Sequence, residues 1–322
     1  MPRIETALTR LLAIEHPILL APMGSAAGGR LAAAVTNAGG LGMIGSGQAN
    51  AATIRQELGE AGNARVGIGF ITWALERNPA ALDVALDTSP AAVMLSFGDP
   101  TPFTGRVKAA GCKIICQVQT LAQAIGAAAA GADIIIAQGR DAGGHSGTTR
   151  GTIGLVPAVV DAVAPIPVVA AGGIADGRGL AAALALGAAG ISMGTRFTAS
   201  RESLWDHAMK EAALNARGDQ TEQTRVFDIV RGSPWPAIYP GRALRNAFSK
   251  NWNGREDELA ADQPAQEKAY LATAADDFAT RVVWAGESVD LVNDIPAAST
   301  IIERIIAQAV ATLTEGAALI RC

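Results

Sequence analysis

Short apolar runs alternate with alanine-rich segments along most of the chain. From Ile18 to Phe197 one unit recurs: a run rich in Ile, Val, Met and Leu, then glycine or a polar residue, then a segment of helical character. Alternating strands and helices of this kind are typical of a parallel sheet built from βαβ units. The runs are almost continuously apolar, which indicates strands that are covered on both faces.

The apolar runs predict eight strands. They cover residues 18–21, 41–45, 66–70, 93–97, 113–118, 134–138, 167–171 and 190–194. Eight strands at intervals of roughly 20 to 30 residues match a (β/α)8 barrel of the TIM type, in the α/β class. A doubly wound open sheet is the alternative, but it needs fewer strands and the sequence marks no switch point. We therefore predict a barrel.

The alternation of apolar runs and alanine-rich segments ends after Phe197. Residues 202–285 hold most of the tryptophan and tyrosine, several prolines and denser charge, and we expect a small, mainly helical cap there. Isoleucines between residues 288 and 312 recur at helical spacing and predict the last barrel helix. The predicted organisation is a barrel of residues 1–203 and 286–322, with a cap of residues 204–285 inserted before the last barrel helix.

The composition argues against several classes of protein. The 322 residues are 49% apolar, carry a formal net charge of −4 and include no long run of Lys or Arg, so we expect no nucleic-acid partner. The apolar runs are too short or too interrupted to span a bilayer, and the N-terminus lacks the pattern of a signal peptide. Three cysteines are too few for a disulfide framework. We predict a cytoplasmic protein with no membrane partner, and the sequence leaves a homodimer open.

Unusual residues follow the predicted strands, at the end of a barrel where catalysis is placed. The sixth strand precedes a turn at residues 141–145 with the sequence Asp-Ala-Gly-Gly-His. Its glycines leave the backbone free to set the His145 imidazole against a ligand. An imidazole titrates near neutrality, which suits proton abstraction or anion binding. His16 and His207 lie away from the strand ends, and we interpret them as structural.

Glycines also follow the last two predicted strands. Gly172 and Gly173 come after the seventh strand, and Gly194 and Thr195 come after the eighth. Glycine lets the backbone approach a ligand closely, so that its amides can point at a phosphate. Barrels often bind phosphate at these two loops. We therefore predict a phosphate site there.

Metal and serine-nucleophile chemistry find little support. Residues 141–145 offer too few ligands for a metal, and no second His or carboxylate stands at ligand spacing. Ser146 has no evident base and lies outside any Gly-x-Ser-x-Gly motif. Asp176 is expected to cap the helix that begins near Gly177.

The strand-end motifs together resemble the nitronate monooxygenase family, formerly called 2-nitropropane dioxygenases. The most specific segment, residues 138–147, reads Gln-Gly-Arg-Asp-Ala-Gly-Gly-His-Ser-Gly and is close to the family's Gln-Gly-x-Glu-Ala-Gly-Gly-His-x-Gly. Residues 171–177 and 193–197 are similar to the family's phosphate loops. The similarity runs from His16 to Phe197 and is weaker at residues 281–296.

The resemblance implies an enzyme that holds FMN in a TIM barrel beneath a small cap. Such enzymes oxidise alkyl nitronates with O2 and give a carbonyl product and nitrite. A nitroalkane would first be deprotonated by His145, which is the implied catalytic residue and would face the substrate. Chemically, the flavin carries the electrons, while the protein supplies position, an anion-tolerant pocket and a base.

The resemblance also implies roles for individual residues. The FMN phosphate would be held by Gly172, Gly173, Gly194 and Thr195. The isoalloxazine would be lined by Ala21, Pro22 and Met23, and its polar edge would contact Gln117 and Gln138. Three further glycines complete the implied cofactor-binding set: Gly69, Gly143 and Gly144.

Gly69 departs from the family pattern, because many relatives carry an amide or an acid at this point of the third strand. One flavin or substrate contact is therefore expected to be absent or taken by water. The candidates for pocket walls are Trp73, Trp235, Tyr239 and Trp284, with core packing as the alternative.

Other activities fit the same scaffold. The Gly-Gly-His turn also occurs in flavin enzymes that use NAD(P)H to reduce quinones or enoyl thioesters. Fold analogy does not separate these activities from nitronate oxidation. A barrel that binds a phosphorylated metabolite without redox chemistry is a third hypothesis.

Overall fold

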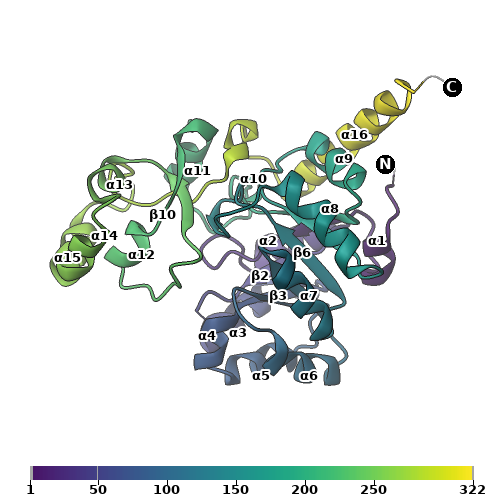
Figure 1. Cartoon of the computed structure of the whole chain (residues 1–322), viewed down its shortest axis with the longest axis horizontal. Coiled ribbons are helices and arrows are strands. Elements are labelled where there is room, and N and C mark those ends of the chain that lie inside the picture. Colours follow the sequence, from purple (N-terminus) through teal and green to yellow (C-terminus); the bar gives the residue numbers. More distant parts are fainter. Residues whose placement is uncertain (1–2, 49, 321–322) are drawn as a thin grey trace.

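Eight parallel strands form a barrel with helices around it (Figure 1). The computed structural model describes residues 3–48 and 50–320. Each strand begins and ends within two residues of its predicted position, so the (β/α)8 fold is confirmed. The strands are β1 (Ile18–Leu20), β2 (Met43–Gly45), β3 (Gly67–Ile71), β4 (Ala92–Ser96), β5 (Lys113–Val118), β6 (Ile134–Gln138), β8 (Val168–Ala171) and β9 (Gly190–Met193).

The barrel closes between its first two strands. Hydrogen-bonded neighbours follow the order β1-β9-β8-β6-β5-β4-β3-β2. Leu41, just ahead of β2, pairs with Leu19 in a parallel bridge, and the Leu20 amide donates to the Leu41 carbonyl at 3.0 Å. The residues before β2 therefore complete the ring.

Alternate residues of each strand enter two different apolar cores. On β6, Ile135 and Ala137 pack outward against the helices, whereas Ile134 and Ile136 pack inside the barrel. Successive side chains of a strand point to opposite faces, so a strand between two cores must be apolar at every position. This is the reason why the strands are visible in the sequence as continuous apolar runs.

Eleven described helices cover or adjoin the barrel. They are α1 (Ala7–Leu12), α2 (Gly29–Asn37), α3 (Ala51–Glu60), α4 (Thr72–Arg77), α5 (Ala80–Leu86), α6 (Thr101–Ala109), α7 (Leu121–Ala129), α8 (Thr152–Val163), α9 (Gly177–Ala185), α10 (Thr195–Thr198) and α16 (Ala298–Ala317). As predicted, Asp176 caps α9, and its carboxylate accepts from the amides of Arg178 and Gly179. Among the described residues, no helix is both long and apolar enough to cross a membrane.

The last barrel helix starts later than the sequence indicated. A helix was expected from residue 288, but residues Glu287–Leu291 form the 3-10 helix η2 and α16 begins at Ala298. Pro296 explains the difference, because a proline disfavours the helical conformation of the residue before it. α16 packs against α9 and α2 with a buried stripe that includes Ile302 and Ile306.

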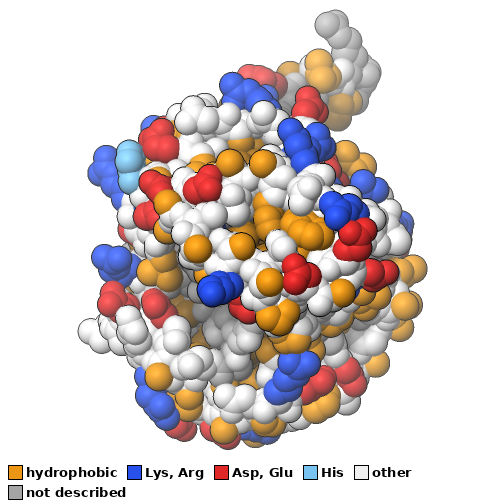
Figure 2. All heavy atoms as spheres, turned by 90° about the vertical axis from the view of Figure 1, so that its left-hand side faces the viewer, with side chains coloured by type: hydrophobic (Ala, Val, Ile, Leu, Met, Phe, Trp, Pro, Cys, Tyr) orange, Lys and Arg blue, Asp and Glu red, His pale blue; other side chains and the backbone are white. Residues whose placement is uncertain are grey.

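Residues between α10 and η2 form a smaller body beside the barrel mouth (Figure 1). It contains α11 (His207–Leu214), η1 (Gly218–Gln220), β10 (Thr221–Thr224), α12 (Val226–Val230), β11 (Gly241–Leu244), α13 (Ala247–Trp252), α14 (Glu256–Ala261) and α15 (Gln263–Ala272). Figure 2 shows acidic and basic side chains interspersed on this side of the molecule. We refer to this body as the cap.

The cap carries a small sheet that the sequence did not predict. Its order is β10-β11-β7, and β7 is Gly144–His145, the end of the glycine turn that follows β6. β10 and β11 have four residues each and the sequences TEQT and GRAL, so they lack the apolar runs that marked the barrel strands. The turn singled out from the sequence is thus a strand shared between barrel and cap.

Candidate functional site

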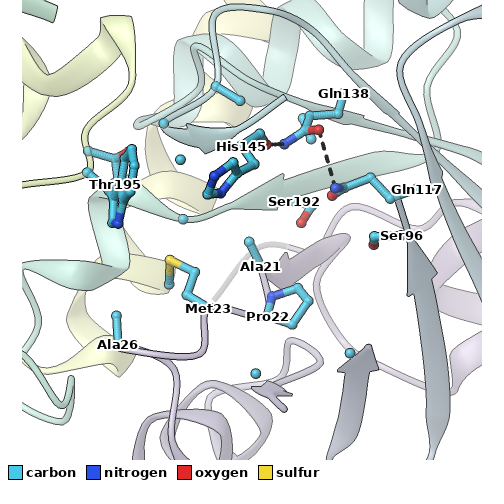
Figure 3. A pocket seen from close by; sticks show the side chains of 18 of the residues that line it. Ala21, Pro22, Met23, Ala26, Ser96, Gln117, Gln138, His145, Ser192 and Thr195 are labelled. Carbon is cyan, nitrogen blue, oxygen red and sulfur yellow. Dashed lines mark hydrogen bonds between the residues drawn. The ribbon is translucent and has the colours of Figure 1, made fainter. Parts of the chain in front are cut away.

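A pocket lies at the carboxyl ends of the barrel strands, on the side of the cap (Figure 3). The structure brings all of the sequence-predicted site residues to its walls, and cap residues complete them. The predicted residues are Ala21, Pro22, Met23, Gly69, Gln117, Gln138, Gly143, Gly144, His145, Gly172, Gly173, Gly194 and Thr195. Residues far apart in sequence therefore share one cavity.

His145 is held by both its backbone and its ring. β7 pairs with β11 so that His145 lies opposite Gly241, and Gln138 Nε2 donates to the His145 carbonyl at 3.1 Å. The imidazole stacks on Trp235 with ring centroids 3.5 Å apart and planes 7° from parallel. Its Nε2 lies 2.9 Å from Asp228 Oδ2. The ring is thereby fixed in one orientation at the pocket wall.

Asp228 is the functional candidate that the sequence analysis missed. It lies on α12 of the cap, 83 residues after His145, and its side chain is only 5% exposed. Its second oxygen accepts from Arg231 Nη2 at 3.2 Å. No short motif surrounds Asp228 in the sequence, so only the folded cap reveals the pair.

Three glutamines form a hydrogen-bonded chain beside His145. Gln138 Oε1 accepts from Gln119 Nε2 at 2.8 Å and from Gln117 Nε2 at 3.3 Å. Gln117 and Gln138 were predicted to contact the polar edge of a cofactor. In the structure they line the pocket, but their amides also bind each other, and Gln138 positions the histidine backbone.

Serines from three strand ends add hydroxyls to the pocket. Ser46, Ser96 and Ser192 are all buried and line the cavity after or at the ends of β2, β4 and β9. Among the described residues, the hydroxyls of Ser46 and Ser192 have no hydrogen-bond partner. Buried polar atoms normally have a partner, so these two oxygens are available to a polar ligand. Their position at the ends of predicted strands is the signal in the sequence that marks them.

The loops after β8 and β9 present free amides. Gly172 and Gly173 adopt φ values of 102° and 67°, which lie in the left-handed region that favours glycine. Within residues 3–48 and 50–320, the amides of Gly172, Gly173 and Gly194 donate to no other group. Consecutive unpaired amides in such a conformation form a concave anion site. This rim of the pocket suits a phosphate.

Side chains around the phosphate rim hold its loops in place. Asp141 Oδ2 accepts from the Thr152 amide at 2.8 Å, and Thr152 Oγ1 donates to the carbonyls of Ala171 and Gly172. Thr195 Oγ1 accepts from the Gly286 amide at 3.1 Å. Asp141 thus orients the loop, while residues from three separate segments build the rim.

Glycine at residue 69 is explained by the close approach of Pro22. A Cβ atom at Gly69 would lie 2.3 Å from Pro22 Cγ, far inside van der Waals contact. A Cβ at Gly194 would lie 3.1 Å from Met23 Sδ. The segment after β1 therefore packs directly against neighbouring strand ends, and a larger side chain at Gly69 has no room.

Aromatic side chains close the pocket on the cap side. Trp235 and Trp284 line it together with Phe97, whose ring meets Trp235 edge to face at 5.0 Å. Trp73 contacts Trp235 from behind the wall. Of the four predicted wall residues, Trp235 and Trp284 line this pocket, whereas Trp73 is absent from its lining.

Tyr239 belongs to a neighbouring cavity. It lines a second hollow beside β5, and its hydroxyl accepts from Gln123 Nε2 at 2.9 Å. Burial raises the pKa of Tyr239, so the phenol stays protonated through the physiological range. The tyrosine therefore anchors the cap loop to α7.

The fold and the site together define a class of protein. A (β/α)8 barrel with a half-buried, oriented histidine and an amide-lined anion rim at the strand ends is an arrangement typical of barrel enzymes that act on a bound small molecule. A model of the nitronate monooxygenase family matches residues 5–67 and 63–308. The chain belongs to this family, and it is an oxidoreductase.

Individual relatives cover nearly the whole chain. A nitronate monooxygenase of Neurospora crassa is 33% identical, over 94% of this chain and 92% of the relative. A (3aS,4S,5R,7aS)-5-hydroxy-7a-methyl-1-oxo-octahydro-1H-indene-4-carboxyl-CoA dehydrogenase of Rhodococcus jostii is 31% identical, over 96% of this chain and 97% of the relative. The structure of FabK from Thermotoga maritima is 35% identical with a TM-score of 0.85, over 98% of this chain and all of that one. The chain thus has relatives with different activities.

Proposed function

We propose that this protein is an FMN-dependent enzyme that oxidises alkyl nitronates with O2 to a carbonyl product and nitrite. Nitroalkanes are substrates when His145 removes their proton. The observation that carries the proposal is the His145 imidazole, fixed by Asp228 and Trp235 at the wall of a pocket with an amide-lined anion rim. Family membership supports the same activity.

Features of the pocket fit FMN. The unpaired amides of Gly172, Gly173 and Gly194 suit the phosphate, and Thr195 lies beside them. The hydroxyls of Ser46 and Ser192, which have no partner in the described part of the chain, suit polar edges of a ring. Pro22 and Gly69, which pack closely against each other, line the same cavity. The remaining predicted cofactor residues, Ala21, Met23, Gln117, Gln138, Gly143 and Gly144, line the same cavity.

The reaction divides between cofactor and protein. FMN, when bound, supplies a two-electron acceptor that O2 can reoxidise. His145 accepts the proton of a neutral nitroalkane, and the imidazolium that results lies beside the Asp228 carboxylate. The rings of Trp235, Trp284 and Phe97 line the same pocket and give it an apolar wall. A nitronate arrives already deprotonated and needs only binding and orientation.

Anaerobic mixing tests the proposal. The purified protein, reconstituted with FMN, is mixed with a nitronate, with NADH and with NADPH, and the visible flavin absorbance is followed. Bleaching by the nitronate and not by the nicotinamides is the expected result. Bleaching by NADH or NADPH alone would overturn it.

A second candidate is a redox reaction of an acyl thioester, with or without NAD(P)H. The observation that favours it is the full-length similarity to two proteins named as carboxyl-CoA dehydrogenases. Flavin reduction by an acyl-CoA, with no response to nitronates, would select this activity. A colourless protein that fails to take up FMN would instead favour a barrel that binds a phosphorylated metabolite.

A further inference from the structure

The His145–Asp228 contact determines which nitrogen of the imidazole carries a proton. Nε2 lies 2.9 Å from Asp228 Oδ2. Asp228 is buried and His145 is half-buried, with exposed side-chain fractions of 5% and 11%. An ionised carboxylate can only accept a hydrogen bond. In the neutral imidazole the hydrogen must therefore reside on Nε2, which leaves the lone pair on Nδ1.

The surroundings prevent the ring from changing this arrangement. Trp235 stacks on one face of the imidazole at 3.5 Å, and Trp284 lies 5.2 Å away at an angle of 49°. Exchange of the two nitrogens by rotation about Cβ–Cγ would sweep the ring through Trp235. The backbone is fixed too, because β7 pairs with β11 and Gln138 holds the His145 carbonyl.

We infer that Asp228 is a positioning residue that locks His145 as the Nε2–H tautomer and makes Nδ1 the atom that takes a proton from the substrate. The inference rests on the proposed function for the identity of that substrate, but the tautomer itself does not depend on it. The inference implies that the site accepts neutral carbon acids, in particular nitroalkanes, as substrates in addition to nitronate anions.

The proton-transfer step balances without any further reactant. The C–H bond next to the nitro group breaks, an N–H bond forms at Nδ1, and the electron pair remains on the substrate as the nitronate. His145 then has hydrogens on both nitrogens and a positive charge beside the Asp228 carboxylate. A buried carboxylate at this distance stabilises that charge, as in other histidine–carboxylate pairs.

Arg231 makes Asp228→Asn a decisive variant. Arg231 Nη2 donates to Asp228 Oδ1 at 3.2 Å, and a guanidinium can only donate. The oxygen of the new amide will therefore face Arg231, and its NH2 group will face His145 Nε2. Because an NH2 group needs an acceptor, Nε2 must lose its hydrogen, and His145 is expected to become the Nδ1–H tautomer.

¹⁵N NMR identifies the tautomer of His145 directly, and the measurement does not require any enzymatic reaction. The chain has only 3 histidines, so the imidazole signals of ¹⁵N-labelled protein can be assigned with a His145→Asn variant. We expect the Nε2–H pattern for His145 in the wild type and the Nδ1–H pattern in Asp228→Asn. Asp219→Asn removes the same charge from an exposed cap residue and should leave the wild-type pattern. The same His145 tautomer in wild type and Asp228→Asn would overturn the inference.

Kinetics then separate positioning from general damage. In Asp228→Asn we expect flavin reduction by neutral nitroethane to fall by about 10²-fold or more, whereas reduction by ethyl nitronate falls by less than about tenfold. Equal losses for both substrates would mean that Asp228 is merely structural and would overturn the inference. If neither compound reduces the wild-type flavin, the proposed function fails, and the NMR result alone decides the tautomer.

Discussion

His145 is the residue on which the proposed chemistry depends most directly. His145→Asn keeps a polar side chain of similar size but cannot take a proton. We expect FMN to remain bound and the rate of flavin reduction to fall by about 10² to 10⁴-fold for neutral nitroalkanes. Anaerobic stopped-flow absorbance measures the rate of flavin reduction. His207→Asn, on the exposed surface of the cap, is the matched control. Unchanged reduction kinetics in His145→Asn would remove this residue from the mechanism.

Gly173 tests the phosphate rim. Its φ is 67°, and a Cβ atom would lie 3.2 Å from Asp141 Cβ at the edge of the pocket. Gly173→Val is expected to lose FMN, since the side chain fills the approach to the free amides. Flavin absorbance after reconstitution and desalting gives the FMN content.

Gly111→Val is the control for Gly173→Val. Gly111 has a similar φ of 72°, but a Cβ there meets no atom within 4 Å. Both variants should lose at least about 1 to 2 kcal/mol of stability from left-handed backbone strain. Only Gly173→Val should lose the cofactor. Full flavin content in Gly173→Val would place the phosphate elsewhere.

Cys116 should be chemically inert in the folded protein. Burial, with a smaller contribution from Asp133, raises the pKa of this thiol to about 12. Because the thiolate is the nucleophile, iodoacetamide at about pH 8 should not label Cys116 until the chain is unfolded. The unfolded thiol ionises at a lower pH than the folded one, so this group also makes stability fall as pH rises towards 12. Mass spectrometry of native and urea-treated protein locates the label, and equal labelling of Cys116 in both would contradict its burial.

Single residues at strand ends could be predicted from the sequence because the barrel fixes where strand ends meet. Once eight strands were recognised, His145, Gly173 and Gly194 had to share one rim. Asp228 could not be predicted in this way. Its distance from His145 depends on how the cap folds, and no general rule states which residues of such a cap come to lie near the barrel strand ends.

The first turn of α9 offers a test at the level of one element. Asp176 Oδ1 accepts from the amides of Arg178 at 3.0 Å and Gly179 at 3.3 Å. Asp176→Ala should lower the free energy of unfolding by about 1 kcal/mol, whereas Asp176→Asn, which also caps helices, should lose much less. Urea unfolding of the two variants measures the difference. Equal losses would mean that the carboxylate charge, rather than the cap, stabilises α9.

The barrel strands have a clear apolar pattern in the sequence, whereas the cap strands do not. β6 is apolar at nearly every position because its residues fill two cores in alternation. β10 has two buried and two half-buried positions, all of them polar, and β7 has only two residues. Such short polar strands form because their partner is already in place, so tertiary contacts and not local pattern specify them.

The whole molecule is expected to unfold as one unit. The cap sheet includes β7 from the barrel loop, Arg242 Nε on β11 donates to the Arg140 carbonyl at 3.2 Å, and Asp228 binds His145. Separate melting of the cap would break all three ties. We therefore expect one transition and not two.

Tryptophan fluorescence provides the measurement. Four of the 5 tryptophans lie between residues 204 and 285, and Trp73 contacts one of them, so fluorescence reports mainly on the cap. Far-UV circular dichroism reports mainly on the more numerous barrel elements. Urea curves from the two probes should coincide, and a fluorescence transition at clearly lower urea would show that the cap melts independently.

The shared strand β7 has a consequence for how such proteins can diversify. His145 leaves the barrel on a loop, but the carboxylate and the indole that orient its ring, Asp228 and Trp235, belong to the inserted segment. Replacing the cap with that of another protein would therefore change the ability of His145 to accept a proton as well as the shape of the pocket. A chimera that keeps the barrel and replaces the insert must also supply an acidic residue within hydrogen-bonding distance of His145 Nε2. On the proposed function, a chimera without that residue is expected to bind FMN but to react poorly with neutral nitroalkanes.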